Sequence, residues 1–232
     1  MNSVPPKPLL EVLDLGRMAY QAALDLQMAR VEELKRDAAA SPNAPEKAYL
    51  LLVEHDPPVI TLGRGADENN VILSPEELKS QGFQIHAVSR GGDVTYHGPG
   101  QLVGYPILRV DRHGRDVHRY LRDIEEVVIR LLARFGVEGS RKPGLTGAWV
   151  GEEKIAATGV ALSRWVSYHG FSLNVCPNLA HFGTIVPCGI SDKGVTSLSV
   201  VLGRRIEVEE VKAPLVETLA EVFGFEVISE RD

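Results

Sequence analysis

The sequence predicts a single domain of mixed α and β structure. Apolar residues recur at helical spacing in some stretches and run together in short strand-like stretches in others. With 232 residues and 44% hydrophobic composition, the chain is long enough to bury one large core. Residues 1–232 are therefore expected to form one domain, and the sequence contains no internal repeat or low-complexity tract.

The first elements are expected to be a strand, a helix and two further strands. Residues 9–15 (LLEVLDL) indicate a strand, and the apolar spacing over residues 16–36 indicates a helix. Residues 37–47, with two prolines, indicate a helix end and an exposed loop. The runs YLLLVEH (49–55) and PPVITLG (57–63) predict two neighbouring strands.

A short capped helix is predicted over residues 74–82. Ser74 can accept a hydrogen bond from the amide near Glu77, and a proline occupies the first helical position. FQIHAVSR (83–90) then predicts a strand that delivers RGGDVTYH (90–97) to a loop, because such a polar, glycine-containing stretch is unlike a buried strand.

The second half of the chain alternates strands with two amphipathic helices. GYPILRV (104–110) predicts a strand, and residues 117–135 repeat apolar positions at helical spacing. Residues 147–162 and 165–175 predict glycine-punctuated strands, and residues 208–223 predict a last helix.

Charge and composition exclude several classes of protein. The net charge of −6 argues against broad nucleic-acid binding, because phosphate affinity depends on lysine and arginine. The first residues lack the pattern of a secretory signal, and no apolar run approaches the roughly 18 residues of a membrane span. Two cysteines cannot build a disulfide framework, so a cytoplasmic protein without membrane attachment is expected.

The two cysteines differ in the residue that follows each. Cys176 precedes Pro177, which has no backbone N–H to offer a developing oxyanion, so a packing role is favoured. Cys188 precedes Gly189, whose unhindered amide allows a carbonyl to approach the sulfur. Cys188 is thus the better candidate nucleophile, although a free cysteine is more often a core residue.

A nucleophilic thiol needs a nearby cation, because the thiolate is the reactive form. The candidates are Lys154, Lys193, His97 and His169. The short residues after Lys154 would admit a ligand close to the backbone, whereas such a lysine is more commonly only snorkelling. The two histidines are equally compatible with hydrogen-bonding roles in the core.

Several separated motifs occur together in this chain. In chain order within residues 49–198, they are EHDPPVITLGRG, RGGDVTYHGPGQLVGYPI, KIAATG, SYHGFSLNV and VPCG. This series resembles the lipoyl(octanoyl) transferases, the lipoate-protein ligase B family. The resemblance implies an α/β (α+β) fold with a mixed β-sheet flanked by helices and a small second sheet, as in the catalytic domain of biotin and lipoate ligases.

The resemblance also implies an activity, an acyltransferase reaction. The family moves an octanoyl group from octanoyl-acyl carrier protein to a lysine of lipoyl domains of 2-oxoacid dehydrogenases and of the glycine-cleavage H protein. Its nucleophilic cysteine corresponds to Cys188 and its activating lysine to Lys154. No cofactor and no metal are implied.

The resemblance further assigns the wall of the acyl pocket to three segments. By this correspondence, the pocket residues are Arg90, Gly91, Gly92, Asp93, Val94, Thr95, Tyr96, His97, Ala157, Thr158, Gly159, Gly170, Phe171 and Ser172. Alternatively, Tyr96 only packs and Arg90 only anchors its own loop. Thr158, where the family commonly has an apolar residue, leaves the preferred acyl length open.

Two rival functions remain compatible with the fold. An ATP-dependent lipoate or biotin ligase would activate its acid as an adenylate and needs no nucleophilic cysteine. A non-catalytic acyl-carrier-binding or scaffold protein would keep the pocket and lose the cysteine and lysine. Residues 108–122 carry five arginines and are a candidate docking patch for an acidic partner, or simply a solvated helix start.

Overall fold

The computed structural model describes residues 7–41, 45–186 and 193–228. The strands are β1 (Leu9–Met18), β2 (Lys47–His55), β3 (Val59–Leu62), β4 (Gln84–Ala87), β5 (Val94–His97), β6 (Gln101–Ile107), β7 (Ala148–Val150), β8 (Glu153–Ser163), β9 (Val166–Asn174) and β10 (Glu226–Ile228). The α-helices are α1 (Tyr20–Ala40), α2 (Pro75–Ser80), α3 (Val117–Arg134), α4 (Leu198–Leu202) and α5 (Val208–Phe223).

The strands form one large mixed sheet and one small sheet, which confirms the predicted fold class. The seven-stranded sheet has the order β10-β1-β2-β6-β9-β8-β7, with β1 parallel to both of its neighbours and the remaining pairs antiparallel. The three-stranded sheet has the order β4-β3-β5.

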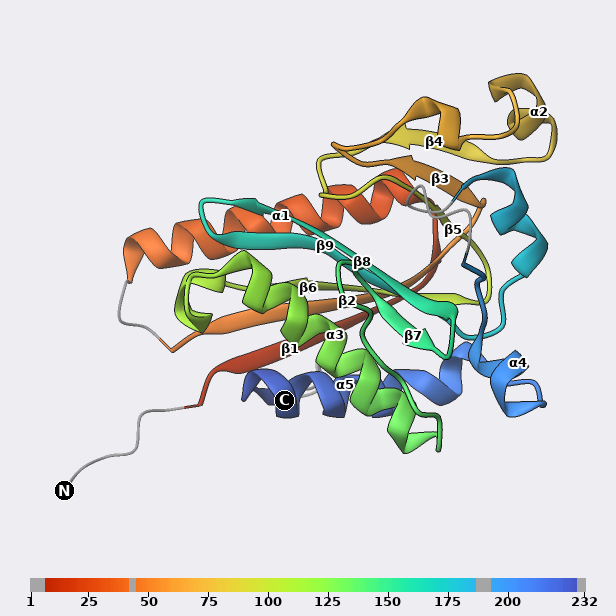
Figure 1. Cartoon of the computed structure of the whole chain (residues 1–232). Coiled ribbons are helices and arrows are strands. Elements are labelled where there is room, and N and C mark those ends of the chain that lie inside the picture. The colour runs from red at the N-terminus through yellow and green to blue at the C-terminus, as the bar shows by residue number, and fades with distance from the viewer. Residues whose placement is uncertain (1–6, 42–44, 187–192, 229–232) are drawn as a thin grey trace.

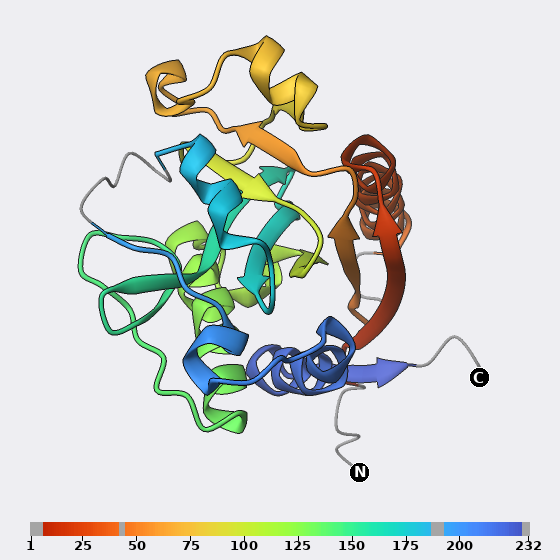
Figure 2. The same ribbon diagram turned by 90° about the vertical axis from the view of Figure 1, so that its right-hand side faces the viewer.

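The helices cover the large sheet on both sides. In Figure 1, α1 and the small sheet lie above the large sheet and α3 and α5 lie below it, and Figure 2 shows the same layers after a quarter turn. The small sheet thus shares a side of the large sheet with α1.

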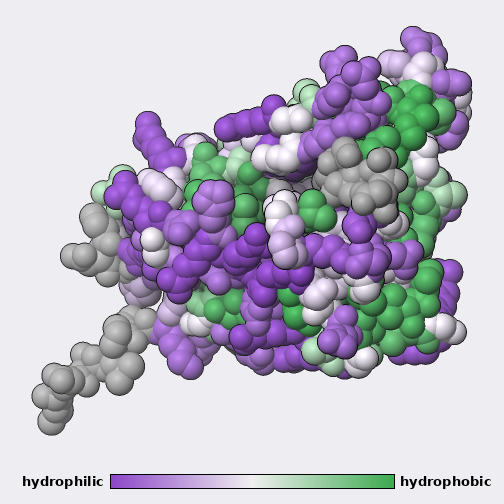
Figure 3. Space-filling model, in the orientation of Figure 1, coloured by the Kyte–Doolittle hydropathy of each residue, from purple (hydrophilic) through white to green (hydrophobic). Residues whose placement is uncertain are grey.

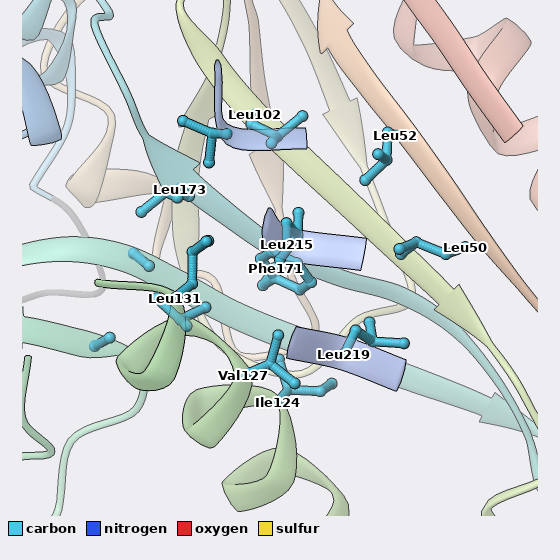
Figure 4. Close-up of a cluster of buried hydrophobic side chains, with 14 of the residues drawn as sticks. Leu50, Leu52, Leu102, Ile124, Val127, Leu131, Phe171, Leu173, Leu215 and Leu219 are labelled. Carbon is cyan, nitrogen blue, oxygen red and sulfur yellow. The ribbon is translucent and has the colours of Figure 1, made fainter. Parts of the chain in front are cut away.

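An apolar core fills the side of the sheet that faces α3 and α5. Side chains of α3 and α5, including Leu131 and Leu219, meet those of β2, β6 and β9, including Leu50, Leu102 and Phe171 (Figure 4). The α3 stripe predicted from the sequence is buried, as expected of an amphipathic helix. A second apolar cluster lies under α1, and a third lies between the small sheet and α2.

The boundary between the first strand and helix differs from the prediction over residues 16–36. β1 continues past Asp14 through a register shift, with Gly16 at φ 58°, and α1 begins only at Tyr20. The helix extends through Ala40, within the segment 37–47 that was predicted to contain a helix end and an exposed loop, and alanine is the best helix former.

The prediction that residues 49–55 and 57–63 are neighbouring strands is wrong. β2 pairs with β1 and β6 in the large sheet, whereas β3 pairs with β4 and β5 in the small one. Between them stand Pro57 and Pro58, which have no N–H to extend a ladder, so the chain leaves one sheet and enters the other.

The loop predicted for residues 90–97 is also wrong in its second half. Val94–His97 form β5, all four residues are buried, and β5 pairs antiparallel with β3. Polar side chains are tolerated there because partners satisfy them: His97 Nδ1 lies 2.7 Å from Gln101 Oε1, and the Tyr96 hydroxyl lies 2.9 Å from His181 Nδ1.

The remaining elements follow the sequence pattern with shifted boundaries. The capping box of Ser74 and Glu77 and the helices α3 and α5 are confirmed. β6 begins at Gln101 and not at residue 104, and it ends at Ile107 because a 3₁₀ turn follows at Val110–His113. The short elements α4 and β10 were not anticipated.

Figure 3 shows where hydrophobic residues reach the surface on one face. Most of that face is hydrophilic, and green atoms gather at its right-hand side, over α4 and near α2. Val200 on α4 is 60% exposed and Ile72 before α2 is 58% exposed.

Candidate functional site

A cavity lies between the small sheet and the large sheet, on the side that α1 also covers. Its walls include most of the residues that the sequence assigned to the acyl pocket. The segment before and within β5 contributes Arg90, Gly92, Thr95 and His97. Strands β8 and β9 contribute Ala157, Thr158, Gly159, Gly170, Phe171 and Ser172.

Four of the assigned residues do not line this cavity. Val94 and Tyr96 point to the opposite side of β5, where they pack in the apolar cluster of the small sheet. Gly91 donates its N–H to the Val160 carbonyl, and Asp93 accepts a hydrogen bond from the Asp67 amide. The alternation of β5 therefore directs Thr95 and His97, but not their neighbours, into the cavity.

Arg90 both lines the cavity and anchors its own loop. Its Nη2 donates to the Thr61 carbonyl at 2.8 Å and to the Thr61 hydroxyl at 2.9 Å, which joins the loop to β3. Gly159 passes close beside it, since a Cβ there would stand 3.2 Å from Arg90 Cδ. Gly92 has φ 87°, a conformation that favours glycine.

Lys154 lies in an adjoining cavity. Three residues, Thr95, Ala157 and Ser172, line both spaces, so the two cavities meet at this point. Lys154 is 7% exposed and is held by its backbone: its N–H donates to Gly194 and its carbonyl accepts from Thr196. The chain that follows Cys188 therefore returns to pair with Lys154.

A chain of buried hydrogen bonds joins His97 to the segment beside Lys154. Gln101 Nε2 donates to Asn174 Oδ1 at 2.9 Å, so Gln101 Oε1 accepts from His97 Nδ1–H at 2.7 Å. Asn174 Nδ2 donates to the Thr196 carbonyl at 2.9 Å. The network links β5, β6 and β9 to the Lys154 bridge and fixes the floor of the second cavity.

The histidines at the cavity are neutral near pH 7. Burial, with smaller effects from His55 and Arg90, lowers the pKa of His97 to about 3. Burial and the nearby Arg90 charge lower the pKa of His169 to about 4. Of the four cation candidates, the histidines are thus uncharged, and Lys193 forms an ion pair with Glu152.

The sequence did not identify two aromatic residues that line the first cavity and not the Lys154 cavity. Tyr20 and Tyr105 line the first cavity only, and their rings lie 5.2 and 6.0 Å from the ring of His55. His55 Nδ1 faces the Met18 carbonyl and therefore donates, so Nε2 accepts from the Tyr105 hydroxyl at 2.7 Å. Such residues have no local signal, because they meet only in the fold.

His169 also lines the cavity, in an unusual backbone conformation. Its φ is 58°, which is uncommon for a residue other than glycine, and its N–H donates to Gln27 Oε1 on α1 at 2.8 Å. Strained residues of this kind cluster at functional sites. The sequence singled out His169 only as a possible cation.

Of the two cysteines, the structure describes only Cys176. Cys188 lies outside the described residues. Cys176 packs against the main apolar cluster, and burial raises the pKa of its thiol, the opposite of what a nucleophile at neutral pH requires.

No group of three or more potential metal ligands occurs among the residues described. Across the described ranges, none of the helices is sufficiently long and apolar to cross a bilayer.

The arginine-rich segment 108–122 begins just after the last residue of β6, at the end of the strand that is far from the Lys154 cavity. Gln101 lies beside the Lys154 cavity and Ile107 is six residues further along the strand, roughly 20 Å away. Arg109 is paired with Asp111, and Arg122 with the buried Glu125.

Three comparisons show what this chain resembles. Residues 19–220 match the family model of the lipoyl protein ligase A/B catalytic domain. An octanoyltransferase of Nostoc sp. is 46% identical over 227 residues, which cover 98% of each chain. An octanoyltransferase of Chloroflexus aurantiacus is 48% identical and covers 94% of this chain and 95% of the relative.

Solved structures share the fold at low sequence identity. A bipartite lipoate protein ligase from Thermoplasma acidophilum has a TM-score of 0.70 at 18% identity, covering 97% of this chain and 88% of that one. Lipoate-protein ligase A bound with ATP has a TM-score of 0.68 at 15% identity, covering 97% and 90%. These likenesses concern the arrangement of the sheets and helices.

Proposed function

The chain belongs to the lipoyl protein ligase A/B catalytic domain family, and we propose that it moves an octanoyl group from octanoyl-acyl carrier protein to a lysine of lipoyl domains. It is an acyltransferase that acts in protein lipoylation, like the octanoyltransferases that match it over nearly its full length. Beyond this activity, we propose the donor, the acceptors and a thioester intermediate on Cys188. We also propose that residues 1–232 act as one catalytic domain and that the protein works in the cytoplasm.

One observation carries the proposal: the two cavities meet. The first is narrow and lined by residues of the predicted acyl wall, and the second contains Lys154. An acyl chain in the first cavity would direct its carbonyl toward Thr95, Ala157 and Ser172, where the Lys154 cavity begins. A buried ammonium at that position is suited to stabilising a thiolate.

The first half-reaction is an exchange of thioesters. The Cys188 thiolate attacks the donor carbonyl, the bond from the carbonyl carbon to the pantetheine sulfur breaks, and the Lys154 ammonium protonates the departing thiolate. Because one thioester replaces another, the step is nearly isoenergetic and needs no ATP.

The second half-reaction forms an amide. The neutral amine of the acceptor lysine attacks the Cys188 thioester, and Cys188 leaves as a thiolate. The proton lost by the new amide nitrogen returns to Lys154, which restores the ammonium and thiolate pair. His97 and His169 do not serve as the charged partner, because both are neutral near pH 7.

The proposed partners are octanoyl-acyl carrier protein as donor, and lipoyl domains and the glycine-cleavage H protein as acceptors. The Thermoplasma acidophilum ligase, whose fold is similar, is described with its E2 lipoyl domain. An ATP-dependent ligase of the same fold is the rival function, since the lipoate-protein ligase A structure is described with ATP bound.

A transfer assay separates these functions. We expect purified enzyme to octanoylate a lipoyl domain from octanoyl-acyl carrier protein without ATP. Cys188→Ala should abolish transfer, while Cys176→Ser should retain most of it, and mass spectrometry of the trapped intermediate should find octanoyl on Cys188. Transfer from free octanoate that requires ATP, or full activity in Cys188→Ala, would exclude the mechanism.

A further inference from the structure

Trp149 is buried in a setting that packing alone does not explain. Its side chain is fully buried, yet among the described residues it belongs to none of the three apolar clusters. Its indole Nε1–H is buried and has no hydrogen-bond partner there. Buried polar groups without partners are rare in native proteins and call for a reason.

Two ammonium groups contact the ring of Trp149. Lys154 Nζ lies 5.0 Å from the ring centroid and Lys142 Nζ lies 5.8 Å from it. Lys142 also forms an ion pair with Glu152, near the surface. Lys154 is the one of the two that lines a cavity and is 7% exposed.

The hairpin of β7 and β8 fixes the first of these contacts. Trp149 and Lys154 are directly opposite one another in the register, which places their Cβ atoms on facing strands within contact range. Trp149 is further secured by two backbone hydrogen bonds with Ser140, at 2.8 and 2.9 Å. These bonds fix the backbone of Trp149, and the full burial of its side chain leaves the ring little room to move, so the ring can orient the longer lysine side chain.

We propose that Trp149 is a positioning residue for Lys154: the face of its indole ring holds the Lys154 ammonium in the second cavity, which adjoins the first. Tryptophan is the strongest cation–π partner, and the interaction strengthens where water is excluded. An aromatic ring attracts the ammonium without being a base, whereas a carboxylate in the same place would pair with the ammonium and could accept its proton. This inference rests on the proposed role of Lys154 and Cys188.

The experiment compares Trp149→Leu and Trp149→Phe with two matched controls. Trp165→Leu removes the other tryptophan of the chain, whose ring contacts Arg115 at 4.9 Å in the turn between β8 and β9. Lys154→Met removes the ammonium itself. All variants carry Cys176→Ser, so that Cys188 is the only cysteine present.

Two kinetic readouts distinguish positioning from packing. We expect Trp149→Leu to lower kcat roughly three- to thirty-fold, with the KM for the donor within twofold, and Trp149→Phe to lie between it and the parent. The pH at which Cys188 reacts with an alkylating agent at half its maximal rate should rise in the same order. Trp165→Leu should leave both unchanged.

A spectroscopic readout tests the contact directly. In a Trp165→Phe background Trp149 is the sole tryptophan, and Lys154→Met should change its emission while leaving the circular dichroism unaltered. If Trp149→Leu does not fold, Trp149→Phe and this emission test still decide the question.

The possible failures are distinct. If Lys154→Met leaves the alkylation profile unmoved, the Cys188 and Lys154 mechanism fails, and the inference fails with it. If Lys154→Met shifts the profile but Trp149→Leu lowers only the melting temperature, the proposed function stands and Trp149 is a packing residue.

Discussion

The seven-stranded sheet is buried by different kinds of side chain where it faces α3 and α5 and where it faces the small sheet, although a second apolar cluster lies beside the small sheet, under α1. Against α3 and α5, leucine, valine and isoleucine form one continuous apolar cluster (Figure 4). Against the small sheet, the same strands present Lys154, Gln101, Ser172 and Asn174 around two cavities. Burying polar groups is costly unless each is bonded. The apolar side therefore provides the stability on which the polar side depends.

The largest expected effect lies on the polar side. Lys154→Met should lower kcat about 10²- to 10⁴-fold, the range for loss of a positioned proton donor, because it removes the ammonium that we propose as the partner of Cys188. Its stability should change little, since methionine fills a similar volume. Single-turnover transfer and thermal unfolding measure the two effects separately. A strongly destabilised variant with a normal rate per folded molecule would reverse the assignment.

The opposite result is expected from the apolar side. Leu131→Ala should lower the free energy of unfolding by about 2–5 kcal/mol, because Leu131 is fully buried and the helix cannot collapse onto the space. The transfer rate per folded molecule should stay within twofold of the parent. Urea unfolding and kinetics of the same preparation provide the check. A large fall in rate at full folding would mean that the two sides are coupled.

The apolar side was also the more predictable from sequence. The apolar residues of α3 recur at helical spacing, and this local pattern is enough to predict which face of the helix is buried. Likewise the capping box of α2 is contained within a few residues. These features need no knowledge of the partner that covers them.

The strands that face the small sheet were predicted less well, because their pairing and burial depend on residues far away in the sequence. β5 was expected to be a loop because its residues are polar, but its burial depends on bonds to Gln101 and His181, which other segments supply. The division of β2 and β3 between two sheets and the pairing of β10 with β1 are also long-range. The family resemblance pointed to segments that line the first cavity, but not to Tyr20 or Tyr105.

The third prediction concerns acid. Burial lowers the pKa of His55 and of His169 to about 4 and that of His97 to about 3, from an ordinary value of 6.5. The folded state therefore binds fewer protons than the unfolded state between about pH 4 and 6.5, and stability falls as the pH drops through this range. Each histidine should cost up to about 2 kcal/mol at pH 5.

Two variants test whether a buried histidine causes this pH dependence. His55→Gln should flatten the fall in unfolding free energy between pH 7 and 5 by about 2 kcal/mol, even if the variant is less stable at pH 7. Leu131→Ala should shift the whole curve downward in parallel, because an apolar core does not titrate. Equal slopes in the parent and His55→Gln would show that His55 is not buried neutral.

A smaller effect is expected at Tyr105, which lines the first cavity, the proposed acyl site. Tyr105→Leu should enlarge the cavity and raise the ratio of kcat/KM for decanoyl over octanoyl donors about tenfold, because decanoyl carries two more methylenes and tenfold is the lower end of what a methylene in an apolar pocket contributes. Tyr105→Phe keeps the ring and should leave the ratio unchanged, although it removes the bond to His55. If both variants accept decanoyl equally, ring size does not set the acyl length.

The smallest effect is expected furthest from the Lys154 cavity, in the arginine-rich segment 108–122. If this segment docks the acidic carrier protein, Arg112→Glu with Arg115→Glu should raise the apparent KM for octanoyl-carrier protein and flatten its salt dependence. Exposed charge pairs contribute about 0.2–1 kcal/mol, so a change of no more than about fivefold is expected.

The small thioester octanoyl-pantetheine is the control donor, because it has no protein surface to dock. Its transfer should be unchanged in the double variant, since Gln101 at the Lys154 end of β6 and Ile107 before the arginines are separated by most of the strand. Equal losses with both donors would instead indicate damage to the fold, for example through the Arg115 contact with the Trp165 ring. An unchanged KM for the carrier protein would move the docking surface away from this end of the sheet, toward the elements that surround the cavities.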